Sequence, residues 1–119
     1  MTKKLIYVQL KRIEDLVRLA ALSITPMVQH ITLEGKHIYF VQSVPLLGRP
    51  VVYFFEGEKK IDKNFIIYNR FNDEITYSDK LSTDGQSVSI PIIEIEKTNL
   101  FEKLPHAKKE KKKEKEEGD

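Results

Sequence analysis

The stretch of sequence that decides the fold is residues 29–41, which read QHITLEGKHIYFV. Polar and apolar side chains alternate on either side of Glu34 and Gly35, a pair suited to a two-residue hairpin turn. Ile31 then lies opposite Ile38, because the residues of a hairpin pair outward from its turn. One face of the predicted hairpin is apolar and carries Ile31, Leu33, Ile38 and Phe40. The other face, which we expect to contact solvent, carries His30, Thr32, His37 and Tyr39.

A helix is predicted before this hairpin. Apolar residues recur at positions i, i+3, i+4, i+7 and i+11, which is one stripe along a helix; they are Ile13, Leu16, Val17, Ala20 and Ile24. Glu14 and Asp15 suit the first turn, where the helix dipole favours negative charge. Pro26 resists continuation of the helix, because the residue before a proline avoids helical geometry. We therefore predict one amphipathic helix that begins near Ile13 and ends before Pro26.

Five further segments have the composition of β-strands, namely residues 5–10, 51–56, 65–71, 74–78 and 87–96. The links between them are short, which favours antiparallel neighbours. Pro91 lies inside the last segment and cannot donate a ladder hydrogen bond, so we predict that this strand is a sheet edge or carries a bulge. The predicted fold class is α+β. It consists of a mainly antiparallel curved sheet of about six to seven strands, one amphipathic helix packed on it, and a short C-terminal helix over residues 99–104.

The chain divides into one domain and a tail. Strong hydrophobic periodicity ends at Leu104, and Pro105 follows it. From His106 onward Ala107 is the only apolar residue, so this segment cannot bury enough surface to offset the entropy of ordering. We predict a single α+β domain over residues 1–104 and a disordered Lys/Glu-rich tail over residues 105–119.

The composition excludes several classes of protein. The 119 residues include no Cys, which removes disulfides, thiolate nucleophiles and thiolate metal sites. Charged residues interrupt the apolar run near the first residue, so no export signal is visible, and no apolar run approaches the roughly 18 residues that span a bilayer. The sequence also leans towards Lys, Glu and Ile, as thermophile proteins do. These features predict a cytoplasmic protein without membrane association.

No catalytic or metal-binding group of residues emerges from the sequence. His30 and His37 are diagonal neighbours on the predicted hairpin, but a zinc site needs three or four ligands and this hairpin face offers no carboxylate. The serines lack the sequence context of a nucleophile elbow. We predict no enzymatic activity, no metal and no cofactor.

The lysines of the tail indicate a polyanionic partner. Six of them lie within residues 108–115, at Lys108, Lys109, Lys111, Lys112, Lys113 and Lys115. Lysine without neighbouring Arg or aromatic residues contacts phosphates but does not read bases. A second basic group consists of Lys3, Lys4, Lys11, Arg12, Arg49, Lys59 and Lys60. The alternative for both groups is an ordinary solvated surface, since residues 1–104 hold 14 basic and 13 acidic side chains.

Apolar residues outside the expected core indicate contact with another protein. Leu46 and Leu47 lie in a loop with two prolines, and the strand around Pro91 is a candidate edge. The alternative for the two leucines is that they tuck beneath the sheet.

These features predict a non-enzymatic accessory or adaptor subunit of a nucleic-acid-processing assembly, in replication, transcription or translation. In this interpretation the folded body docks on a protein partner and the tail contacts nucleic acid. The alternative is a protein–protein interaction module or inhibitor without nucleic-acid contact, with a homodimer as one of its forms.

Overall fold

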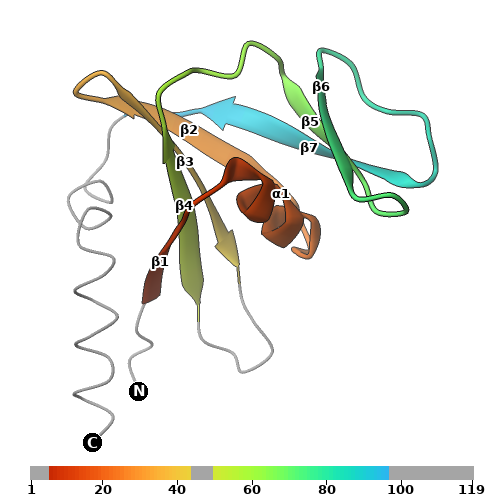
Figure 1. The fold of residues 1–119 in the computed structure, drawn as a ribbon, viewed down its shortest axis with the longest axis horizontal. Coiled ribbons are helices and arrows are strands. Elements are labelled where there is room, and N and C mark those ends of the chain that lie inside the picture. The colour runs from red at the N-terminus through yellow and green to blue at the C-terminus, as the bar shows by residue number, and fades with distance from the viewer. Residues whose placement is uncertain (1–5, 44–49, 97–119) are drawn as a thin grey trace, which may run out of the picture.

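The structure, a computed structural model, describes residues 6–43 and 50–96. Within them the elements are β1 (Ile6–Leu10), α1 (Ile13–Ala21), β2 (Val28–Leu33), β3 (Lys36–Ser43), β4 (Val51–Gly57), β5 (Phe65–Asn69), β6 (Glu74–Ser78) and β7 (Ser87–Glu94) (Figure 1). Predictions that lie outside the described residues concern Lys3, Lys4, Leu46, Leu47, Arg49, the helix at residues 99–104 and the tail at residues 105–119.

The described strands form one mixed sheet of seven strands in the order β1-β4-β3-β2-β7-β5-β6. The α+β class is therefore confirmed. Strands β1 and β4 are parallel neighbours, as are β2 and β7, so the expectation of antiparallel neighbours is wrong for these two pairs. A parallel pair needs a long connection between its strands. Here α1 and the β2–β3 hairpin connect β1 to β4, and four strands separate β2 from β7 along the chain.

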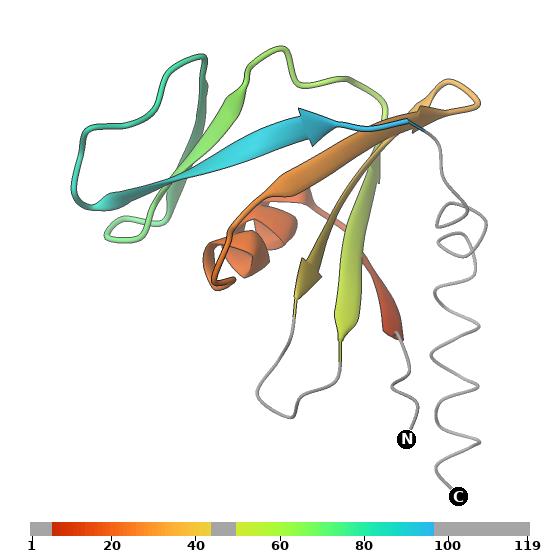
Figure 2. The same ribbon diagram turned by 180° about the vertical axis from the view of Figure 1, so that it is seen from behind.

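Strand β7 joins two parts of the sheet and is not an edge strand. Its first half pairs with β5 up to Pro91, which lies opposite Phe65, and its last residues pair with β2, beginning with Ile92. The proline thus lies where the strand changes partner, and the next N–H, that of Ile92, donates to the carbonyl of Asn64 at 2.9 Å. The prediction that Pro91 marks a sheet edge is wrong. Proline has no backbone N–H to donate, and the strand tolerates this because Pro91 lies where its pairing changes from β5 to β2. The two parts of the sheet run in different directions in Figure 2, and the edge strands are β1 and β6.

The β2–β3 hairpin has the predicted register, with Ile31 opposite Ile38. Glu34 and Gly35 form its turn, with φ values of 52° and 82°. Both angles are positive, which is the conformation that a two-residue turn needs to match the twist of its strands. The hairpin is therefore confirmed in both its pairing and its turn.

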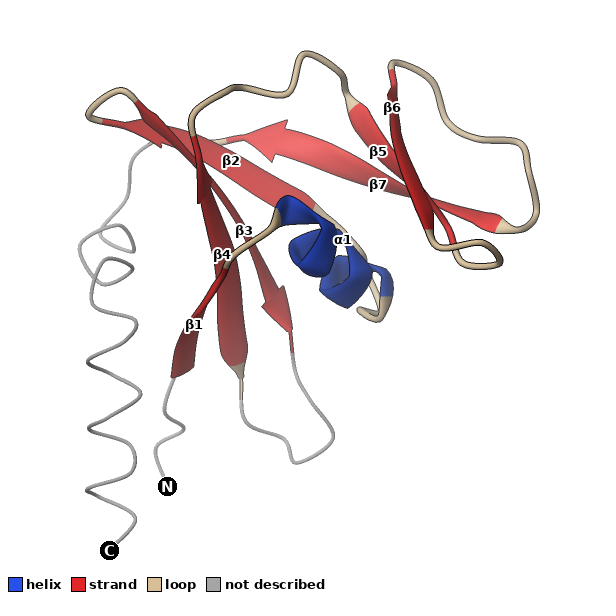
Figure 3. Ribbon diagram, in the orientation of Figure 1, coloured by secondary structure: helices blue, strands red, loops and turns tan. Residues whose placement is uncertain are grey.

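Both faces of the central strands are buried. On one face lies a cluster of Tyr7, Ile31, Ile38, Phe40, Val52 and Phe54. The helix covers the other face (Figure 3), where Leu16, Val17 and Ala20 pack in a cluster that includes Val28, Tyr39, Val41, Ile66 and Ile90. Full burial of a Val, Leu, Ile or Phe side chain stabilises the fold by about 1.5–3 kcal/mol relative to leaving that side chain exposed. The expectation that the face of His30 and Tyr39 contacts solvent is wrong, because both residues are buried beneath other elements of the chain.

Helix α1 is shorter than predicted. It ends at Ala21, and the N–H groups of Leu22 and Ser23 donate to the carbonyls of Leu19 and Ala20 in a tight last turn. Ile24, which the apolar stripe placed on the buried face, is instead 99% exposed. The chain leaves the helical path before Ile24, so the periodic spacing no longer directs that side chain into the core.

Candidate functional site

The best candidate for a binding site lies where the end of α1 meets the turn between β5 and β6. Three large apolar side chains are exposed there: Leu22 at 80%, Ile24 at 99% and Phe71 at 83%. Single exposed apolar residues are ordinary, but several together on a small protein mark contact sites. We name Leu22, Ile24, Arg70 and Phe71 the Arg70 surface.

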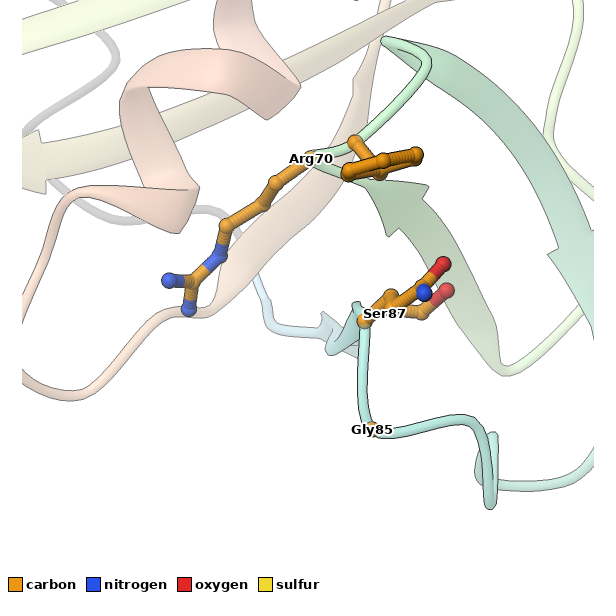
Figure 4. Close-up of a pocket in the computed structure, with 5 residues that line it drawn as sticks. Arg70, Gly85 and Ser87 are labelled. Atoms are coloured by element: carbon orange, nitrogen blue, oxygen red, sulfur yellow. The ribbon is translucent and has the colours of Figure 1, made fainter.

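Three adjoining hollows connect these four residues. A hollow of about 260 Å³ is lined by Arg18, Ala21, Leu22, Tyr68 and Arg70. A second, of about 330 Å³, is lined by Arg70, Phe71, Gly85, Gln86 and Ser87 (Figure 4). A third, of about 240 Å³, includes both Leu22 and Ile24 in its lining. The first hollow shares Arg70 with the second and Leu22 with the third, so the four residues of the Arg70 surface line neighbouring hollows.

An ion-pair network fixes the helix against the β5–β6 turn. Arg18 of α1 donates from Nε and Nη2 to the two carboxylate oxygens of Asp73, both at 3.0 Å, and from Nη1 to Asp15 at 2.8 Å. The hydroxyl of Tyr68 also donates to Asp73, at 2.9 Å. Hydrogen bonds from Arg18 and then from Tyr68 lower the pKa of Asp73 below its ordinary value. The fork of the guanidinium matches the carboxylate geometry, so this pair orients the helix end relative to the turn.

The turn itself holds Phe71 in solvent. The side-chain carbonyl of Asn69 accepts hydrogen bonds from the backbone N–H groups of Phe71, at 2.8 Å, and Asn72, at 3.3 Å. Asp73 has a φ of 59°, a left-handed conformation that Asp tolerates better than most residues. These contacts fix the backbone on both sides of Phe71, so its exposure follows from the turn geometry.

Arg70 carries the unneutralised charge of this surface. Among the described residues it forms no ion pair, whereas the neighbouring Arg18 is bound by two carboxylates. In Figure 4 the Arg70 side chain extends away from Gly85 and Ser87, towards the segment that follows α1. An exposed guanidinium beside apolar side chains is suited to a carboxylate carried by a binding partner.

A second group of polar residues contacts the β4–β5 connection, residues 58–64. We name His30, His37 and Tyr39 the sealed group, in which His30 and Tyr39 are buried and His37 is half-buried. Nε2 of His30 lies 3.1 Å from Nδ1 of His37, and the ring of His30 stacks on that of Tyr39 with centroids 4.6 Å apart. The Tyr39 hydroxyl donates to the carbonyl of Lys59 and accepts from the N–H of Ile61, each at 2.8 Å. This group therefore ties the connection to the sheet.

The environment of His30 favours its neutral form. Burial lowers the pKa of His30, and the nearby His37 and Lys60 lower it further, while Glu94 opposes them. A neutral pair can share one proton between its ring nitrogens. Among the residues that the structure describes, no three His, Cys, Asp or Glu side chains gather closely enough to hold a metal ion. The hydrogen bond of the pair joins β2 to β3.

The predicted basic residues within the described ranges lie at one end of the sheet. Lys11 and Arg12 follow β1, and Lys59 and Lys60 follow β4, and these strands are parallel. Acidic partners lie among them: Arg12 pairs with Asp15 at 3.1 Å, and Lys60 pairs with Glu94. The described residues hold nine Lys and Arg against twelve Asp and Glu, a net charge of −3. The described part of the chain is therefore acidic overall.

Comparisons with family models, with curated proteins and with solved structures found no match for this chain. The single helix that the structure describes has nine residues, too few to cross a membrane.

The sequence-based prediction missed all four residues of the Arg70 surface. A signal was available for two of them. Leu22 falls outside the apolar stripe that begins at Ile13, and Phe71 directly precedes a turn at Asn72 and Asp73. A large apolar residue off the helix stripe or beside a turn does not belong to the predicted core. The same reasoning identified Leu46 and Leu47 as candidate contact residues.

Proposed function

We propose that this chain is a non-catalytic protein-interaction subunit whose folded body binds a protein through the Arg70 surface. The observation that carries the proposal is the exposure of Leu22, Ile24 and Phe71 around Arg70, which has no ion pair within residues 6–43 and 50–96, over adjoining hollows. Arginine and aromatic residues dominate the binding energy of protein interfaces, because they combine a large contact area with directional hydrogen bonds.

The charge of the body supports a protein as its partner. A nucleic-acid-binding surface needs clustered cations, since phosphate contacts supply most of its affinity. The described residues carry a net charge of −3, and Lys60, Arg12 and Arg18 are already paired with acids. Apolar contact around one arginine, which the Arg70 surface offers, is suited to a protein partner.

Affinity capture with matched variants tests the proposal. The full chain is immobilised and exposed to nuclease-treated native extract, in parallel with Ile24→Asp and with Ile93→Asp. Ile24 is fully exposed on the Arg70 surface, whereas Ile93 is a 40% exposed residue of β7 that contributes to none of the three hollows. We expect specific proteins to be retained by the natural chain and by Ile93→Asp but lost with Ile24→Asp. Retention of the same proteins by all three chains would contradict a role for this surface.

A second candidate function is contact with nucleic acid by the lysine-rich tail. The six lysines within residues 108–115 favour it, because such a segment can neutralise phosphates without a folded site. Together with protein docking, this contact would make the chain an accessory subunit of a nucleic-acid-processing assembly.

Fluorescence anisotropy of a labelled single-stranded oligonucleotide tests the tail. Replacement of all six tail lysines by Gln should abolish binding at low salt, and binding by the natural chain should fall steeply as salt rises. The matched control is Lys59→Gln with Lys60→Gln in the body, which should leave binding nearly unchanged. Binding that survives the tail substitutions but not the body substitutions would refute the assignment to the tail.

A further inference from the structure

We propose that the partner of the Arg70 surface is a second copy of this chain. In the inferred homodimer, Phe71 of each chain enters the hollow between α1 and β5 of the other, about a two-fold axis. The inference rests on the proposed function, since it names the partner of the same surface.

Phe71 has the properties of an inserting side chain. Its ring is 83% exposed, and the hydrogen bonds of the Asn69 side chain fix the backbone that presents it. A phenylalanine side chain on a fixed backbone has only two torsions to order on binding, so most of its apolar burial remains available for affinity.

The hollow beside it suits an aromatic ring. Its volume of about 260 Å³ exceeds the roughly 150 Å³ that accepts a benzene molecule in an engineered protein cavity. Ala21, Leu22 and Tyr68 supply apolar lining, and the side chains of Arg18 and Arg70 complete the wall. A guanidinium close to an inserted ring adds a cation–π attraction. The ion pairs of Arg18 with Asp15 and Asp73 keep the wall in place before binding.

The combination of ring and hollow on one surface favours a second copy over an unrelated protein. Arg70 lines both this hollow and the one that contains Phe71, so the inserting and accepting features are immediate neighbours. A two-fold interface uses the same patch on both chains and therefore requires a self-complementary patch. The two insertions form together and close the assembly at two chains.

Charge on the same surface is also self-complementary. Exposed acids flank Phe71 on neighbouring turns: Glu74 begins β6, and Asp84 precedes Gly85 of the second hollow. Neither carboxylate forms an ion pair with Arg70 of its own chain. In a two-fold pair, these acids supply carboxylates near the interface for Arg70 of the other copy.

Sedimentation velocity of the full chain, from about 1 to about 100 µM, tests the inference. We expect twice the chain mass of 13.9 kDa at the upper end of this range. Phe71→Ala should weaken the dimer by about 30-fold or more, as loss of a central aromatic contact does. Ile93→Ala is the matched control and should dimerise as the natural chain does. Because Phe71 is exposed, the alanine variant should keep the circular dichroism spectrum of the natural chain.

A second variant tests the accepting side of the interface. Ala21→Phe places a ring in the hollow of its own chain and should give a monomer, even though Phe71 is retained. A natural chain that is monomeric throughout, or a dimer that neither Phe71→Ala nor Ala21→Phe weakens, would overturn the inference.

The capture experiment separates this failure from failure of the proposed function. A monomer that still loses captured proteins with Ile24→Asp would retain a protein-binding surface with another partner. A monomer that captures nothing dependent on Ile24 would lose both proposals.

Discussion

The β2–β3 hairpin and the β5–β6 turn reverse the usual positions of polar and apolar side chains. In the hairpin the polar His30 is only 3% exposed, although it lies on the more polar of the two hairpin faces. In the turn the apolar Phe71 is 83% exposed. The difference shows that side-chain chemistry alone does not fix burial, because the elements that cover each face come from distant parts of the chain.

The two regions also differ in how their polar groups are satisfied. In the hairpin, His30 bonds to His37 and the Tyr39 hydroxyl bonds to two backbone groups of the β4–β5 connection. In the turn, Asn69 bonds to the backbone of Phe71 and Asp73 bonds to Arg18, while the neighbouring Arg70 has no ion pair among the described residues. The polar groups of the hairpin are thus bonded within the fold, whereas the turn leaves Arg70 and Phe71 exposed to solvent.

The largest expected effect compares two phenylalanines. Phe40→Ala, in the hairpin, should lower the free energy of unfolding by about 3–5 kcal/mol, because the ring is 2% exposed and its removal leaves a cavity. Phe71→Ala should change it by less than about 0.5 kcal/mol. Urea denaturation of both variants at a concentration that gives monomers measures the difference. Equal losses would show that Phe71 belongs to the core of the molecule.

A smaller effect is expected from one hydroxyl of the sealed group. Tyr39→Phe keeps the ring but removes both hydrogen bonds to the β4–β5 connection, leaving the Lys59 carbonyl and the Ile61 N–H without this partner. The free energy of unfolding should fall by about 1–3 kcal/mol. Tyr77→Phe is the matched control, because Tyr77 is 42% exposed on an edge strand, and it should be nearly neutral. Equal stability of both variants would mean that the connection is held by other contacts.

This comparison also explains how much of the fold could be predicted from the sequence. The hairpin register depends on residues close together in the chain, so the positions of Ile31, Ile38 and the Glu34–Gly35 turn were sufficient to predict it. The pairing of β1 with β4 and of β2 with β7 depends on contacts between distant segments, which local alternation does not encode. Pro91 was predicted at an edge or a bulge because the sequence shows the missing donor but not the change of partner that accommodates it.

The candidate site was less predictable than the fold, for a related reason. Leu22 and Phe71 are far apart in the sequence, and the Arg18–Asp73 ion pair that brings their elements together joins residues 55 positions apart. Periodicity placed Ile24 on the core stripe because it cannot show that the helix ends at Ala21. The exposed apolar surface lies where the end of α1 meets the β5–β6 turn. A pattern within one segment of the sequence does not show that these two elements are in contact.

The smallest expected effect is a pH dependence that belongs to the hairpin. The pKa of His30 is lowered in the folded chain, chiefly by burial and then by His37 and Lys60, with Glu94 in opposition. The unfolded chain therefore binds more protons at this residue once the pH falls below about 6.5. Stability from this source is fully present above that pH and decreases as the pH falls towards the lowered pKa.

Thermal unfolding between pH 7 and pH 5 measures the slope of stability against pH. Most carboxylates titrate below this range, so they contribute little to the slope. His30→Gln should flatten the slope, whatever its effect on stability at pH 7. His37→Gln should reduce the slope without abolishing it, because burial is the first cause of the lowered pKa and His37 the second. An unchanged slope in His30→Gln would place the pH dependence outside the sealed group, and the hairpin would then differ from the β5–β6 turn in packing alone.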